Sequence, residues 1–105
     1  MAPKKTPNRR KKGLNLRLFV AGSSIRSLRT IDSVKQACEK HVPGRYDLTI
    51  VDIYVHPEAA IEAHIVAAPT LIRLFPKPLR MFVGEISRAS DLDLDFSRLA
   101  AAGQL

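Results

Sequence analysis

The side chains that most often carry out chemistry in proteins are few and widely spaced in this chain. There is one cysteine, Cys38, and there are three histidines, His41, His56 and His64. A single cysteine cannot close an intrachain disulfide or supply a Cys-x-x-Cys dithiol. The histidines fall at a helix end, in a loop and on a helix, without the i, i+4 pair that a helical zinc site uses. We therefore predict neither a dithiol redox site nor a metal site, and we expect Cys38 to be a buried structural thiol.

Three acidic residues alternate near the C-terminus, Asp91, Asp93 and Asp95. Such alternation is loosely similar to a cation-binding loop, but the glycine and the terminal glutamate of a calcium-binding hand are missing. A helix N-terminus, which favours negative charge, explains the first two more simply. The chain also lacks a glycine-rich phosphate loop, a Ser-His-Asp order and a recognisable pair of catalytic carboxylates. The sequence thus predicts no enzyme, no catalytic residue and no cofactor.

The net charge of +7 is concentrated in one short segment. Residues 1–13 contain six basic residues and no acidic one, which leaves 11 basic and 10 acidic residues in the remainder. This segment also lacks the apolar residues that offset the entropy of ordering, so we predict a disordered basic arm. A solubilising leader is one interpretation of the arm, and a weak, salt-sensitive contact with nucleic acid or an acidic partner is the other. The six basic residues are Lys4, Lys5, Arg9, Arg10, Lys11 and Lys12.

The length of 105 residues suits one domain with a single core, which we place at residues 14–105. No apolar run approaches the roughly 20 residues of a membrane helix, and the first residues lack the apolar stretch of a signal peptide. With a single cysteine, the composition fits a reducing compartment. We therefore expect a cytoplasmic protein without a membrane segment.

Hydrophobic periodicity predicts a strand and a long helix in the first half of the chain. Residues 14–20 alternate as a strand does, and Ser23 or Ser24 is a suitable cap for the helix that follows. That helix ends at Pro43-Gly44, and residues 48–53 then form a short strand rich in β-branched residues. The predicted apolar stripe of the helix consists of Ile25, Leu28, Ile31, Val34, Cys38 and Val42.

The second half predicts a short helix, a hairpin and a closing element. Pro57 suits the first position of a helix, and residues 70–75 and 79–83 form two strands joined by Pro76-Lys77-Pro78. From Ser90 the spacing favours a helix, although the alternation of Leu92, Leu94 and Phe96 also allows a strand. One side of the short helix is expected to consist of Ala60, Ile61, His64 and Ile65.

The predicted order βαβαββα is that of the thioredoxin core. It describes an α/β domain in which a parallel βαβ half precedes an antiparallel hairpin and a closing helix. We therefore expect a thioredoxin-like fold, with a single mixed sheet flanked by helices.

Five motifs, in order, make this chain resemble the KaiB family. They are Leu16-Arg17-Leu18-Phe19-Val20-Ala21-Gly22, Val51-Asp52-Ile53 with Pro57, Ala67-Ala68-Pro69-Thr70-Leu71, Pro76 and Pro78 with Arg80, and Gly84-Glu85-Ile86-Ser87. These residues are similar to the family's opening strand ending in Tyr-Val-Ala-Gly, its second strand with Asn-Pro, its Ala-Thr-Pro-Thr-Leu run, its Pro-x-Pro-x-Arg turn and its Gly-Asp-Leu-Ser. The sequence departs from the family at Ser23-Ser24-Ile25, at His64 and at 94–98, where the glycine of the family's Ile-Gly-Leu-Asp-Leu run is absent.

The resemblance implies a function and a second fold. A KaiB-like protein binds the hexameric ATPase KaiC without catalysing a reaction, and in clock systems it counters KaiA. The resemblance also implies that the C-terminal half can adopt a second, ground-state fold. Of the two folds, only the thioredoxin-like one engages KaiC. A histidine kinase with a related sensor domain is a further possible partner, and a homodimer or homotetramer is expected.

Several residues gain a role from the predicted thioredoxin-like fold, and Arg29 also matches an arginine of the family that the chain resembles. Ser23, Ser24, Ile25 and Arg26 occupy the place where a thioredoxin has its dithiol, so a redox enzyme is excluded there. Pro69 corresponds to the cis-proline of thioredoxin-like folds. The candidate partner-binding residues are Arg17, Arg26 and Arg29, and solvated surface charge is the alternative interpretation of all three.

Two alternatives to a KaiC-binding protein remain. One is a nucleic-acid-associated protein that acts through its basic arm, although we consider nucleic acid a less favoured partner than an ATPase. The other is a stress-related adaptor that uses the same domain without a clock.

Overall fold

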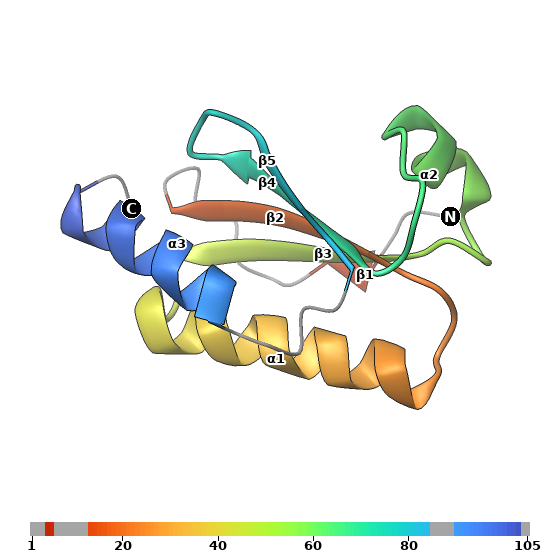
Figure 1. Cartoon of the computed structure of the whole chain (residues 1–105), viewed down its shortest axis with the longest axis horizontal. Coiled ribbons are helices and arrows are strands. Elements are labelled where there is room, and N and C mark those ends of the chain that lie inside the picture. Colours follow the sequence, from red (N-terminus) through yellow and green to blue (C-terminus); the bar gives the residue numbers. More distant parts are fainter. Residues whose placement is uncertain (1–3, 6–12, 85–89, 104–105) are drawn as a thin grey trace.

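The computed structural model describes residues 4–5, 13–84 and 90–103, and its central feature is a five-stranded mixed sheet (Figure 1). The strand order across the sheet is β1-β3-β2-β4-β5. The predicted order βαβαββα is confirmed, with β1 as an additional two-residue strand. The strands are β1 (Lys4–Lys5), β2 (Leu14–Val20), β3 (Tyr46–Asp52), β4 (Thr70–Phe75) and β5 (Arg80–Val83), and the helices are α1 (Ile25–His41), α2 (Pro57–Glu62) and α3 (Ser90–Ala101).

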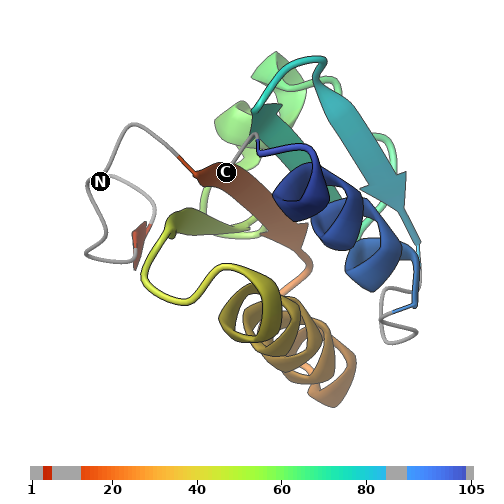
Figure 2. The ribbon, with the colours of Figure 1, turned by 90° about the vertical axis from the view of Figure 1, so that its left-hand side faces the viewer.

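The helices cover the two faces of the sheet unequally. The strands β2 and β3 are parallel and are connected through α1, whereas β4 pairs antiparallel with both β2 and β5. Helices α1 and α3 lie side by side on one face, and α2 lies on the other (Figures 1 and 2). This is the thioredoxin-like arrangement expected from the sequence, rather than the alternative ground-state fold of the C-terminal half.

The alternation of side chains in β2 divides the core into two clusters. Leu14, Leu16, Leu18 and Val20 point toward α1 and α3, and Phe19 points toward α2. All five are buried. Because successive side chains of a strand point to opposite faces, one strand supplies both clusters. The smaller cluster consists of Phe19, Val51 and Ile72, with alanines of α2 packed against it.

The buried stripe of α1 differs from the predicted one at its N-terminal end. Ile25 and Leu28 are 71% and 56% exposed, while Ser27 and Thr30 are buried. Their hydroxyl groups donate to the carbonyl oxygens of Ala21 and Arg26 at 3.3 and 2.9 Å, so burial leaves neither hydroxyl unpaired. The prediction was therefore wrong for Ile25 and Leu28. It was correct for Val34, Cys38 and Val42, which are buried, and Ile31 is partly buried against the same core.

The short helix α2 is also oriented differently from the sequence-based expectation. Ala60 and Ile65 pack against the smaller cluster as expected, but Ile61 is 73% exposed. His64 lies beyond the end of the helix and has a φ of +57°. Ala59 and Ala63 pack against the same cluster.

The closing element is a helix, which resolves the two alternatives left by the sequence. Leu92, Phe96 and Leu99 recur at helical spacing and are buried against α1 and the sheet. Leu94, which strand alternation would have buried with them, is 55% exposed. Residues 85–87, which belong to the last of the five motifs, lie outside the described residues.

Two residues of the predicted basic arm lie against the sheet. Lys4 and Lys5 form β1, which pairs antiparallel with Ile50 and Thr49 of β3. Gly13 is buried with a φ of +103°, and a Cβ placed there would lie 2.0 Å from the carbonyl oxygen of Arg45. Only glycine fits this position. The other residues of the arm lie outside the described part of the chain.

Candidate partner-binding surface

The loops that follow β2 and β3 are fixed to each other by one carboxylate. Asp52 Oδ1 accepts hydrogen bonds from the backbone amides of Gly22 at 3.0 Å and Tyr54 at 2.9 Å. The amide of Ile53 donates to the carbonyl oxygen of Val20 at 2.9 Å, which extends the pairing of the two strands. The carboxyl edge of the β2–β3 pair is therefore a well-ordered platform.

Hydroxyl groups, rather than thiols, occupy the start of α1. Ser24, one of the two caps that the sequence allowed, caps the helix by accepting from the amide of Ser27 at 3.2 Å. Cys38 is fully buried further along α1, where desolvation raises the pKa of its thiol to about 12. The thiol is thus protonated at neutral pH and shielded from reagents, which makes it a poor nucleophile.

Exposed apolar side chains follow both strands at this carboxyl edge. Tyr54 is 74% and Val55 is 62% exposed, and the Tyr54 ring lies 3.2 Å from the position that a Cβ on Gly22 would occupy. The exposed Ile25 and Leu28 begin α1 directly after Gly22–Ser24. We name the five residues Ile25, Leu28, Arg29, Tyr54 and Val55 the carboxyl-edge surface. Apolar groups rimmed by charge are typical of protein-binding surfaces.

The three predicted partner-binding arginines do not form one cluster. Arg26 and Arg29 are exposed and neighbour each other on α1, next to Ile25 and Leu28. Arg17 is exposed on β2 but alternates with Leu16 and Leu18, so it lies on the opposite face of the sheet from α1. A single flat partner surface therefore cannot engage all three side chains.

Pro69 lies at the start of β4, where its carbonyl oxygen accepts from the amide of Gly84 at 2.9 Å. The Ala68–Pro69 peptide bond is cis in the structure. The Phe75–Pro76 and Lys77–Pro78 bonds in the following turn are also cis, which sequence reasoning did not anticipate.

A buried ionic cluster between the sheet and α3 was missed by sequence reasoning. Arg73 of β4 donates from one Nη to both carboxylate oxygens of Asp95, at 2.7 and 2.6 Å, and the two side chains are 4% and 6% exposed. Arg80 approaches the same carboxylate at 3.3 Å. The sequence does contain a signal for this cluster. Arg73 lies in the middle of the apolar residues 70–75, and a charge buried there needs an acidic partner.

Two of the three histidines, His41 and His56, have structural partners. His41 Nε2 lies 3.0 Å from Asp93, and its ring packs edge-on against Phe96, with ring centroids 6.3 Å apart. Asp93 therefore links α3 to the end of α1, in addition to any interaction with the helix dipole. His56 contacts Glu58 at 3.4 Å. Within residues 4–5, 13–84 and 90–103, no three histidine, cysteine or acidic side chains are arranged to hold a metal ion.

No helix among these described residues could span a membrane.

Comparison with solved structures defines the class of the domain. The chain superimposes on the N-terminal domain of Synechococcus elongatus SasA with a TM-score of 0.72 and 17% identity, covering 92% of this chain and 91% of that one. It superimposes on chloroplastic thioredoxin z with a TM-score of 0.71 and 18% identity, covering 87% and 81%. The fold is therefore that of a thioredoxin-like domain, here with serines where a thioredoxin carries its dithiol.

Sequence comparison identifies the family. The KaiB domain matches residues 17–95. A circadian clock oscillator protein KaiB from Prochlorococcus marinus is 35% identical over 81% of this chain and 83% of its own length, and another from Trichodesmium erythraeum is 36% identical over 73% and 74%. The circadian clock protein KaiB3 of Synechocystis is 35% identical over 69% and 71%. The chain belongs to the KaiB family.

Proposed function

We propose that this protein is a non-catalytic regulator that binds a KaiC-type hexameric ATPase and modulates it in a circadian or stress-related process. Membership of the KaiB family carries the proposal, since the similar proteins are described as circadian clock proteins. The thioredoxin-like arrangement supports it, because the resemblance implies that this form engages the ATPase. The serines at the start of α1 and the buried Cys38 favour binding over redox catalysis.

The carboxyl-edge surface is the docking site that we propose for the ATPase. Tyr54 and Val55 supply apolar area on a loop whose backbone is hydrogen-bonded to Asp52, so the backbone needs little further ordering on binding. Arg29, with Arg26 beside it, can select an acidic rim on the partner. Arg17 would contact a different partner or a second subunit, because it lies on the other face of the sheet. KaiA or a histidine kinase is a candidate for that second contact.

Size-exclusion chromatography with light scattering tests the proposal. The protein is run alone and then mixed with a KaiC hexamer from the same source, in ATP and in ADP. Co-elution in a larger particle is the expected result, and separate elution in both nucleotides would refute ATPase binding. The run without KaiC also measures whether the resting protein is a monomer, a dimer or a tetramer.

Variants of exposed residues locate the surface without disturbing the core. Tyr54→Ala and Arg29→Ala are expected to weaken ATPase binding at least tenfold, since exposed tyrosine and arginine dominate many interfaces. Lys35→Ala is the matched control, because Lys35 is an exposed basic residue of α1 outside the carboxyl-edge surface. Equal affinities for all three variants, with KaiC still bound, would place the interface elsewhere on the domain.

The nucleic-acid alternative is tested separately in the basic arm. Replacing Arg9, Arg10, Lys11 and Lys12 with glutamine removes four charges and keeps Lys4–Lys5, which pair with β3. We expect ATPase binding to be unchanged. If the wild-type protein binds nucleic acid in a salt-sensitive way and this variant does not, the arm has that activity. The abundance of the protein in its native host then distinguishes the two remaining alternatives. A rhythmic abundance indicates a clock component, and an abundance that rises under stress indicates an adaptor.

A further inference from the structure

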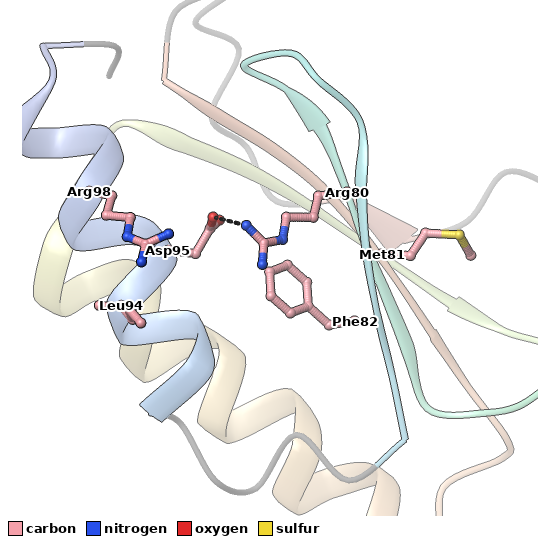
Figure 3. A pocket seen from close by; sticks show the side chains of 6 residues that line it. All are labelled: Arg80, Met81, Phe82, Leu94, Asp95 and Arg98. Atoms are coloured by element: carbon pink, nitrogen blue, oxygen red, sulfur yellow. Dashed lines mark hydrogen bonds and ion pairs between the residues drawn. The ribbon is translucent and has the colours of Figure 1, made fainter.

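A cavity of about 230 Å³ lies between β5 and α3, on the opposite side of the sheet from α2. Its lining consists of Arg80, Met81, Phe82, Leu94, Asp95 and Arg98. Figure 3 shows Arg80 and Arg98 extending toward Asp95 from the strand and from the helix. Neither Arg98 nor Leu94 belongs to the carboxyl-edge surface, so the cavity is a separate feature of the domain.

The charges around the cavity do not balance. Asp95 is already neutralised by Arg73, which donates to both of its oxygens. Arg80 contacts the same carboxylate at the longer distance of 3.3 Å and is 52% exposed, so it can turn toward a ligand. Arg98 has no side-chain hydrogen bond or ion pair with any residue in the described part of the chain. Among the described side chains at the cavity, three guanidinium groups face one carboxylate, which leaves a net charge of +2.

The walls of the cavity strengthen this positive field. Phe82 is partly buried in the core, and the Arg80 guanidinium lies 5.4 Å from the centre of its ring. Leu94 provides a second apolar wall on α3. A charge held against apolar groups is screened less than one surrounded by water, so an anion entering here interacts more strongly than at an open surface.

We propose that this cavity binds a phosphate-class dianion, either orthophosphate or the phosphate group of a small phosphorylated metabolite. The two uncompensated charges match the charge of a phosphate monoester near neutral pH. A tetrahedral anion has oxygens that point in several directions, so it can accept from guanidinium groups that approach from two elements. A planar carboxylate instead pairs with a single guanidinium group. The volume is below that of most drug-sized pockets and accommodates a small anion. The proposal does not depend on ATPase binding.

Titration of the isotope-labelled full-length protein followed by NMR tests this site. Orthophosphate is added at constant ionic strength near pH 7.5, and the amide signals of Phe82, Leu94 and Arg98 are expected to shift saturably. Arg98→Gln is expected to raise the dissociation constant about tenfold, the loss of one charge-assisted interaction. The matched control Arg29→Gln, an exposed arginine of α1, is expected to leave it unchanged. Sulfate is expected to bind like phosphate, and acetate more weakly.

Three results would overturn the proposal. The first is the absence of saturable shifts at the cavity, which would mean that orthophosphate does not bind there. The second is an equal loss of affinity in Arg29→Gln and Arg98→Gln, which would mean that the anion responds only to net charge. The third is acetate binding as tightly as phosphate, which would remove the selectivity for a tetrahedral dianion.

Discussion

Replacement of Asp95 by asparagine is the most direct test of how α3 is held on the sheet. Asp95 accepts both short hydrogen bonds from Arg73, and the two side chains are almost completely buried. Asparagine keeps the size of the side chain and removes its charge. The Arg73 guanidinium would then be buried without a counterion, and its Nε already has no hydrogen-bond partner among the described residues.

The expected loss of stability follows from this burial. Removing one partner of a buried ion pair typically costs about 3–5 kcal/mol. A single domain has only about 5–15 kcal/mol of stability, so the loss is a large fraction of the total. With a urea m-value of about 2 kcal/mol/M for a domain of this size, the midpoint of unfolding should fall by roughly 2 M.

Urea unfolding followed by circular dichroism measures this shift. Arg73→Met combined with Asp95→Leu is the informative companion, since replacing both charges by apolar groups is often neutral. We expect the double variant to recover most of the stability that Asp95→Asn loses. A midpoint within about 0.5 M of the wild type for Asp95→Asn would refute a strongly stabilising buried pair.

Three further predictions concern the thiol, a helix cap and a tight junction. Because burial raises the pKa of Cys38 from 9.0 to about 12, the folded state keeps its proton where the unfolded state loses it, so stability should fall between pH 9 and pH 12. Urea unfolding across this range should show a weaker decline for Cys38→Val. Ser24→Ala removes the cap of α1 and should cost about 1 kcal/mol in the same assay at pH 7. Gly13→Ala should lower the melting temperature more than Gly44→Ala does, since both glycines have positive φ but only Gly13 faces a backbone clash.

Each of these has an outcome that would contradict it. Equal alkaline declines for wild type and Cys38→Val would assign the pH dependence to other groups. An unchanged stability for Ser24→Ala would mean that solvent replaces the cap without cost. Equal melting temperatures for the two glycine variants would show that the chain around Gly13 moves to accommodate a methyl group.

The sequence alone determined the order of the elements and the family. Alternation in residues 14–20 located the central strand β2, and the prolines that flank residues 70–75 bounded the strand β4. The pair Ser23 and Ser24, and then Pro57, marked helix starts because capping effects are local. These features depend on neighbours in sequence, so no knowledge of the packing was needed.

Only the tertiary structure decided which side chains meet across the fold. Arg73 and Asp95 are 22 residues apart in sequence, and their contact depends on how α3 lies against β4. The exposure of Ile25 and Leu28 depends on the rotation of α1, which the satisfied hydroxyl groups of Ser27 and Thr30 allow. The separation of Arg17 from Arg29 likewise required the sheet between them. Periodicity in the sequence shows that one face of a helix or strand is buried. The packing of distant elements decides which residues form that face.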